Sequence, residues 1–171
     1  SPSLRSSINA LEVILNGENI KEMAENSNGD LIIETDFGSI IIEDSNLSDF
    51  DYKNETRILL EKVAISAEDY KNLNLLSKTG FKVSITPTEP KAATILIPAE
   101  GFEKGEKVDV VIVDKNGDLT QTKGEVVEIS EKLFVEIEAE SFGTFILGGE
   151  KKLYFTDVPF DLWCYDASAF A

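Results

Sequence analysis

Short runs of hydrophobic residues alternate with polar turns along most of the chain, a pattern that predicts β-strands. The Leu- and Ile-rich runs 31–33 and 40–42 flank a turn and predict a hairpin over 30–43, in which Gly38 supplies a positive φ. A second hairpin is expected around Asn116-Gly117, because this dipeptide favours a two-residue turn with positive φ at both positions. Its strands are expected at 108–113 and 119–122.

Further strands are predicted upstream and downstream of this hairpin. Leu133, Val135, Ile137 and Ala139 alternate with polar or aromatic positions, and Glu136, Glu138 and Glu140 form a solvated face of that strand. The remaining apolar runs that predict strands are 81–85, 93–97 and 142–147.

Helical patterns are fewer. The segment 18–26 predicts a helix with Ile20, Met23 and Ala24 on its inner face, and a second helix is expected to begin at Ser66 and end near Gly80. The first 15 residues fit two structures. Leucine and isoleucine recur there at helical spacing, while 11–15 alone reads equally well as a strand.

Seven to nine short strands and few helices predict a mainly β fold, an antiparallel β-sandwich with one or two short helices. Gly148-Gly149 and the charged residues after them have the composition of a boundary. We therefore expect a β-sandwich module over 1–149 and a separate segment over 150–171.

Composition narrows the function. The 171 residues include 32 Asp and Glu against 16 Lys and Arg, which gives a net charge of −16. Such a surface repels phosphate backbones and anionic lipids, so neither nucleic-acid binding nor membrane-surface binding is expected. No apolar run approaches the roughly 18 residues that a spanning helix needs, so membrane insertion is not expected either. There is no histidine, which removes Ser-His and Cys-His nucleophile pairs, and the single Cys164 has no partner for an intrachain disulfide.

Three oxygen-bearing side chains, Asp114, Asn116 and Asp118, are spaced as in calcium loops. An EF-hand loop would place its glycine after the third acidic residue, whereas Gly117 comes before it. A hairpin turn is the favoured interpretation, and a weak Ca²⁺ site is the alternative; no other cofactor is expected. A platform on which sugars stack is one interpretation of Phe134, Tyr52 and Phe102, and ordinary core or sheet-face packing is the favoured one.

The tail is the most distinctive segment. It reads Tyr-Phe-Thr-Asp-Val-Pro-Phe-Asp-Leu-Trp-Cys-Tyr-Asp-Ala-Ser-Ala-Phe-Ala over 154–171 and resembles the opening of an S-layer homology (SLH) domain. The matching positions are Phe155, Asp157, Val158, Pro159, Trp163, Tyr165, Asp166 and Ala167. The resemblance covers about the first third of one such domain and ends inside its first helix, so 150–171 is expected to be a linker and a truncated SLH start.

The region before the tail is similar, more loosely, to modules that precede SLH domains in Gram-positive surface proteins. Their last strand often reads His-Phe-Ser-Thr-Phe, where this chain has Ser141-Phe142-Gly143-Thr144-Phe145. Some related modules cleave themselves at that point, which is not expected here because the histidine is missing and the serine is displaced. The same resemblance favours a strand at 11–15.

These features together predict a non-enzymatic structural or spacer module of a secreted bacterial surface protein, located at the cell wall in an S-layer. The resemblance implies binding to wall polysaccharide through a complete SLH region, not through this fragment, and contacts with neighbouring copies. Two alternatives stay open: an adhesin or carbohydrate-binding module on the same anchor, and an accessory domain of a wall-attached hydrolase.

Overall fold

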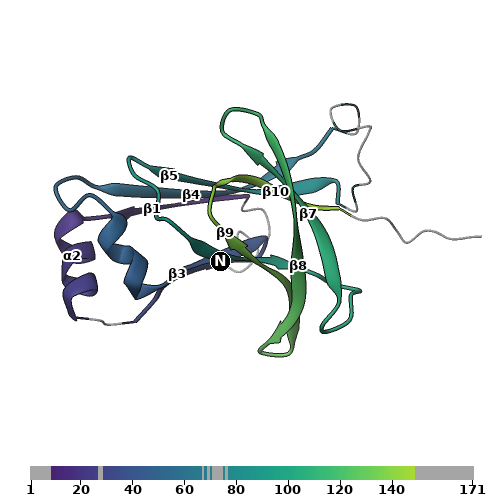
Figure 1. The fold of residues 1–171 in the computed structure, drawn as a ribbon, viewed down its shortest axis with the longest axis horizontal. Helices are drawn as coiled ribbons and strands as arrows, with labels where there is room; N and C mark the ends of the chain where they lie inside the picture. The colour runs from purple at the N-terminus through teal and green to yellow at the C-terminus, as the bar shows by residue number, and fades with distance from the viewer. Residues whose placement is uncertain are drawn as a thin grey trace, which may run out of the picture.

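The computed structural model describes residues 9–26, 29–66, 68, 70, 75 and 77–148. Ten strands, one α-helix and one 3₁₀-helix follow one another in this part of the chain (Figure 1). Their bounds are β1 Ala10–Leu15, α2 Gly17–Asn26, β2 Leu31–Thr35, β3 Gly38–Ile42, η1 Asp44–Asp49, β4 Thr56–Ala64, β5 Thr79–Thr86, β6 Ala93–Pro98, β7 Lys107–Asp114, β8 Leu119–Ile129, β9 Lys132–Ala139 and β10 Gly143–Gly148.

All ten strands belong to one antiparallel sheet, in the order β1-β4-β5-β10-β7-β8-β9-β6-β3-β2. The prediction of a mainly β, antiparallel fold with one or two short helices is therefore confirmed. Figure 1 shows β8 running across the direction of β4 and β5, so the sheet bends strongly between its two halves. The facing layers expected of a sandwich are two parts of one continuous sheet.

The bend brings strands that are distant in the sheet order into contact. The ring of Phe37, between β2 and β3, meets the ring of Phe81 in β5 edge-on, with centroids 6.0 Å apart. Interior strands direct alternate apolar side chains into this space, where Ile40, Ile95 and Val135 are fully buried. Burial of these side chains is the main source of stability, at about 25 cal/mol for each Å² of apolar surface.

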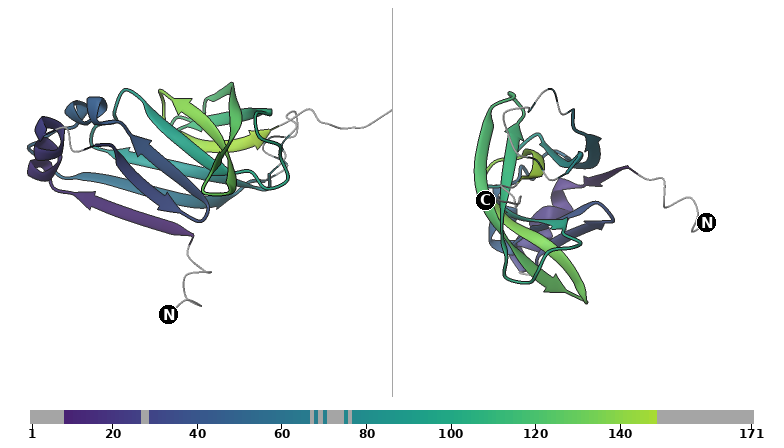
Figure 2. Two further views of the ribbon diagram at one scale, coloured as in Figure 1. Left: turned by 90° about the horizontal axis from the view of Figure 1, so that it is seen from below. Right: turned by 90° about the vertical axis from the view of Figure 1, so that its right-hand side faces the viewer.

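Both short helices lie at one end of the sheet, α2 after β1 and η1 after β3 (Figure 2). The predicted helix 18–26 is confirmed as α2, and Asn16 Oδ1 accepts the N–H of Glu18 at its N-terminus (2.7 Å). Ile20 is buried, while Met23 and Ala24 pack partly buried against the core. The two-way pattern at 11–15 resolves as strand β1, because pairing with β4 satisfies its backbone.

Two other helix and strand expectations need correction. Seven residues of the helix predicted from Ser66 to near Gly80 lie outside the described residues, and none of the others is helical. Leu75 forms an isolated antiparallel bridge with Gly148, and Gly80, the expected end, is the second residue of β5. The strand expected at 119–122 continues to Ile129 as β8, which pairs with β7 and then with β9.

Gly38 does not have the positive φ expected of it. Thr35 and Gly38 close the two-residue loop, and Thr35 Oγ1 donates to the carbonyl of Gly38 (2.5 Å). A Cβ at Gly38 would lie 2.6 Å from a ring carbon of Phe81. The absence of a side chain therefore serves the close approach of β5, not the turn geometry.

The Asn116-Gly117 turn also differs from the prediction. Gly117 has a φ of +88°, but Asn116 does not have a positive φ. The N–H of Gly117 donates to the Asp114 carbonyl (2.9 Å), and the N–H of Asp114 donates to the Asp118 carbonyl (3.0 Å). These bonds define a three-residue loop, a type I turn followed by a left-handed glycine, in place of the two-residue turn.

Candidate functional site

The three candidate calcium ligands, Asp114, Asn116 and Asp118, lie in the β7–β8 loop and are joined by hydrogen bonds within it. Oδ1 of Asp114 accepts the backbone N–H groups of both Asn116 and Asp118 at 2.9 Å. That carboxylate therefore organises the β7–β8 loop as an Asx turn, and one of its oxygens is already engaged. This bonding favours the hairpin interpretation over a cation site, since a bound cation would compete with two amides for the same oxygen.

The three aromatic candidates do not come together as one surface. Tyr52 and Phe102 are partly buried against the hydrophobic core from two different loops. Phe134, on β9, is half-buried and pairs with Pro98 across the β6–β9 ladder. A sugar platform built from all three is therefore excluded by their positions.

Phe134 does line a groove of ≈ 530 Å³ at one end of the sheet. The β2–β3 turn contributes Asp36, the β6–β7 loop contributes Glu100, and the β8–β9 turn contributes Glu131 and Lys132. The lining combines apolar residues with three carboxylates and one lysine, and this net negative set suits a ligand that has an apolar body and a positive charge.

A second groove of ≈ 590 Å³ lies at the start of β10, where β5 continues beyond its last pair with β10. β5 pairs with β4 over eight residues but with β10 only at Phe81 and Lys82. Beyond Lys82, the groove separates β5 from Asp114 and Lys115 of the β7–β8 hairpin. Two basic and two acidic residues line it, so its charges balance and select no ligand class.

Glu136, Glu138 and Glu140 are exposed, as predicted for a solvated strand face. Glu138 Oε1 accepts a hydrogen bond from Thr94 Oγ1 on the neighbouring β6. Among the described residues there is no cluster of three or more Asp, Glu, Cys or His side chains suited to a metal ion, and no helix long and apolar enough to cross a membrane.

Asp51 is the acidic residue whose electrostatics are most clearly altered. The backbone N–H of Lys53 donates to its Oδ1 (2.8 Å), and Asn54 Nδ2 donates to its Oδ2 (2.6 Å). These two bonds hold the pKa of Asp51 below its usual value of 3.8. The side chain is exposed and its partners are local, so the arrangement stabilises the loop before β4.

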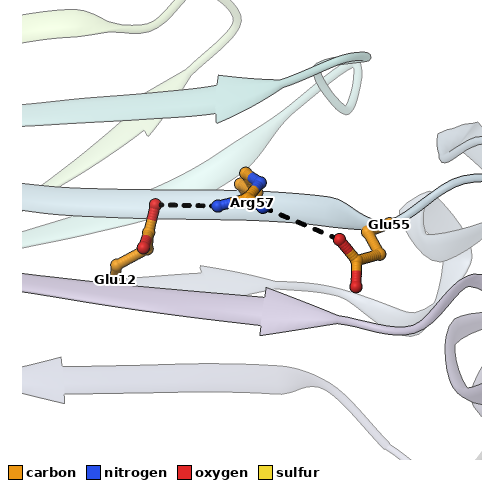
Figure 3. A network of polar contacts seen from close by, with 3 residues as sticks. All are labelled: Glu12, Glu55 and Arg57. Carbon is orange, nitrogen blue, oxygen red and sulfur yellow. Dashed lines mark ion pairs between the residues drawn. The ribbon is translucent and has the colours of Figure 1, made fainter.

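The two outer strands of the sheet carry charge in different ways. On β1, Glu12 forms an ion pair with Arg57 of β4 (3.5 Å), which also contacts Glu55 (3.8 Å), as Figure 3 shows. On β2, Glu34 is exposed and forms no ion pair with any described residue. The acidic residues at 30, 34 and 36 are visible in the sequence, but the place of β2 at a sheet edge depends on the sheet order.

The SLH-like positions Phe155, Asp157, Val158, Pro159, Trp163, Tyr165, Asp166 and Ala167 lie outside the described residues. Comparisons with protein families, with curated proteins and with solved structures gave no match.

Proposed function

We propose that this chain is a non-enzymatic structural module of a secreted bacterial surface protein, attached to the cell wall through an SLH region that begins in its tail. The observation that carries the proposal is the SLH-like segment from Phe155 to Ala167, close after the last strand of the sheet. The proposed location is the extracellular cell wall, and the proposed wall ligand is polysaccharide bound by a complete SLH region.

The arrangement of the strands supports a module that projects from its anchor. Ladder pairing joins Ala10 to Glu61, Glu61 to Lys82, and Lys82 to Thr144. The start of β1 is therefore level with the start of β10. Because β1 and β10 run in opposite directions, β1 begins and β10 ends toward the same end of this part of the sheet. The helices α2 and η1 lie at the other end (Figure 2).

A binding experiment tests the anchor. The 171-residue chain and a version extended through a complete SLH region are incubated with cell walls stripped of their own surface proteins. We expect the extended form to sediment with the walls and the short form to stay in solution, because a short isolated helix is marginal in water. A Trp163→Ala substitution in the extended form should weaken sedimentation.

The acidic groove at Phe134 favours one alternative, a ligand-binding module on the same anchor. Sedimentation of the short form to the same extent as the extended form would place a wall-binding site within the sheet domain. A Phe134→Ala variant of the short form would then separate the groove from other surfaces. Failure of both forms to sediment would contradict the wall-anchor proposal.

A further inference from the structure

The outer edge of β2 has the features of a surface that accepts another strand. No described strand pairs with this edge, so alternate residues direct backbone N–H and C=O groups away from β3. Its solvent-facing row is Asp30, Ile32, Glu34 and Asp36, all exposed. Ile32 is 55% exposed, which is the largest value among the exposed large hydrophobic residues.

The charge of this row indicates what kind of strand fits. β3, the neighbour of β2, has no Lys or Arg, so no base on the adjacent strand offsets Glu34. The opposite edge differs, because Arg57 of β4 is paired with Glu12 of β1. Opposite charges on directly facing strands are favourable, and like charges are unfavourable.

A second copy of this chain is a poor occupant for the same reason. Antiparallel pairing of β2 with β2 about Ile32 would place Glu34 opposite Asp30 of the other copy. The net charge of −16 adds long-range repulsion between copies. Pairing between the β2 edges of two copies is therefore unfavourable, although the backbone groups of this edge can still form a ladder with another strand.

We propose that the outer edge of β2 binds an extended basic segment of another protein, which adds to the sheet as an eleventh strand. Main-chain hydrogen bonds would supply affinity and side-chain pairing would supply specificity, as in other cases of strand addition. The preferred segment has Lys or Arg opposite Asp30, Glu34 and Asp36, and a β-branched residue opposite Ile32. This interaction does not depend on the wall anchor.

The probe is the capped peptide Lys-Thr-Lys-Val-Val-Val-Lys. In antiparallel register its first, third and last residues face Asp36, Glu34 and Asp30, and its fifth faces Ile32. The control peptide has the same residues with alternate backbone nitrogens methylated, which keeps the charge and removes ladder donors. Titration calorimetry should show binding of the probe and affinity at least about tenfold lower for the methylated control.

Two protein variants with the same change of net charge separate the edge from general electrostatics. Glu34→Lys on β2 should weaken probe binding by about tenfold, because attraction becomes repulsion in a facing pair. Glu12→Lys on β1 should change the affinity by less than about threefold, since only the screened long-range field is altered. Equal losses in the two variants would overturn the proposal.

Amide hydrogen exchange is measured on the unmodified chain, so misfolding of a variant cannot affect the result. The probe should slow exchange in β2 and leave β1 unchanged. Three outcomes would overturn the proposal: no binding, equal binding of the methylated peptide, or protection confined to another strand. Concentration-dependent self-association that protects β2 without the probe would also overturn it, in favour of a second copy.

Discussion

Gly117 and Gly38 are both glycines at the ends of hairpin loops, yet different physical constraints act on them. Gly117 has a φ of +88° and nothing within 4 Å of where a Cβ would be, so its requirement is conformational. Gly38 lies against the Phe81 ring, so its requirement is space. Only the constraint on Gly117 could be predicted from neighbouring residues, because the constraint on Gly38 comes from Phe81, which is distant in the sequence.

Replacing Gly117 with Val should therefore be far more harmful than replacing Lys115 with Val. A β-branched residue in the left-handed region costs about 1 kcal/mol or more, whereas Lys115 is exposed and has no positive φ. Denaturant unfolding of the two variants measures the difference. Equal free energies of unfolding would contradict the positive φ of Gly117 in the β7–β8 loop.

Asp51 should make stability depend on pH at the acidic end. Its pKa is lowered in the folded chain, so its contribution is present above the unfolded value of 3.8 and is lost as pH falls through the folded pKa. The stability gap between the native chain and Asp51→Ala should be present at neutral pH and shrink in acid. A gap that stays constant from about pH 6 to pH 2 would contradict this assignment.

At the scale of elements, the β8–β9 turn has a conformation that its sequence does not favour. Ser130 and Glu131 have φ values of 53° and 70°, and Ile129 pairs with Lys132 across a two-residue loop. Two consecutive left-handed residues define a type I′ turn, for which Asn-Gly is the preferred sequence.

Replacing Ser130-Glu131 with Asn-Gly should raise the free energy of unfolding by about 1 kcal/mol, because the side chains that resist positive φ are removed. Thermal and denaturant unfolding both measure this change. Glu131→Gln is the matched control, since it removes the charge and keeps the side chain, and it should leave stability nearly unchanged. If Glu131→Gln alone raised the free energy of unfolding by the same amount, the stabilisation would come from loss of the charge and not from the turn conformation.

Elements with a local signature could be predicted from the sequence, and those that depend on distant partners could not. The Leu-Ile hairpin, α2 and the alternating strand β9 each carry a pattern within their own residues. β4 was not predicted because Leu59, on its outer face, obscures the alternation of Thr56, Ile58 and Leu60. The edge position of β2 follows from the order of ten strands, which no single segment encodes.

At the scale of the whole molecule, the sheet should fold without the tail. All ten strands lie within 10–148, so deletion of 153–171 should leave the unfolding midpoint and its denaturant dependence nearly unchanged. The matched control is truncation before Gly143, which removes β10 from between β5 and β7 and should abolish cooperative unfolding. Loss of the transition in the first deletion would show that the tail is part of the folded unit.

The placement of β1 and β10 also decides how the module responds to tension. Force applied at Ala10 and Gly148 has a component across the strands, because Ala10 is level with Thr144, three strands away in the sheet order, and Gly148 lies four residues further along β10. The Ala10–Glu61 pair of the β1–β4 ladder is loaded first, and later pairs break one after another instead of sharing the load. Under tension, β1 should peel away at low force, so that the chain lengthens before the rest of the sheet unfolds.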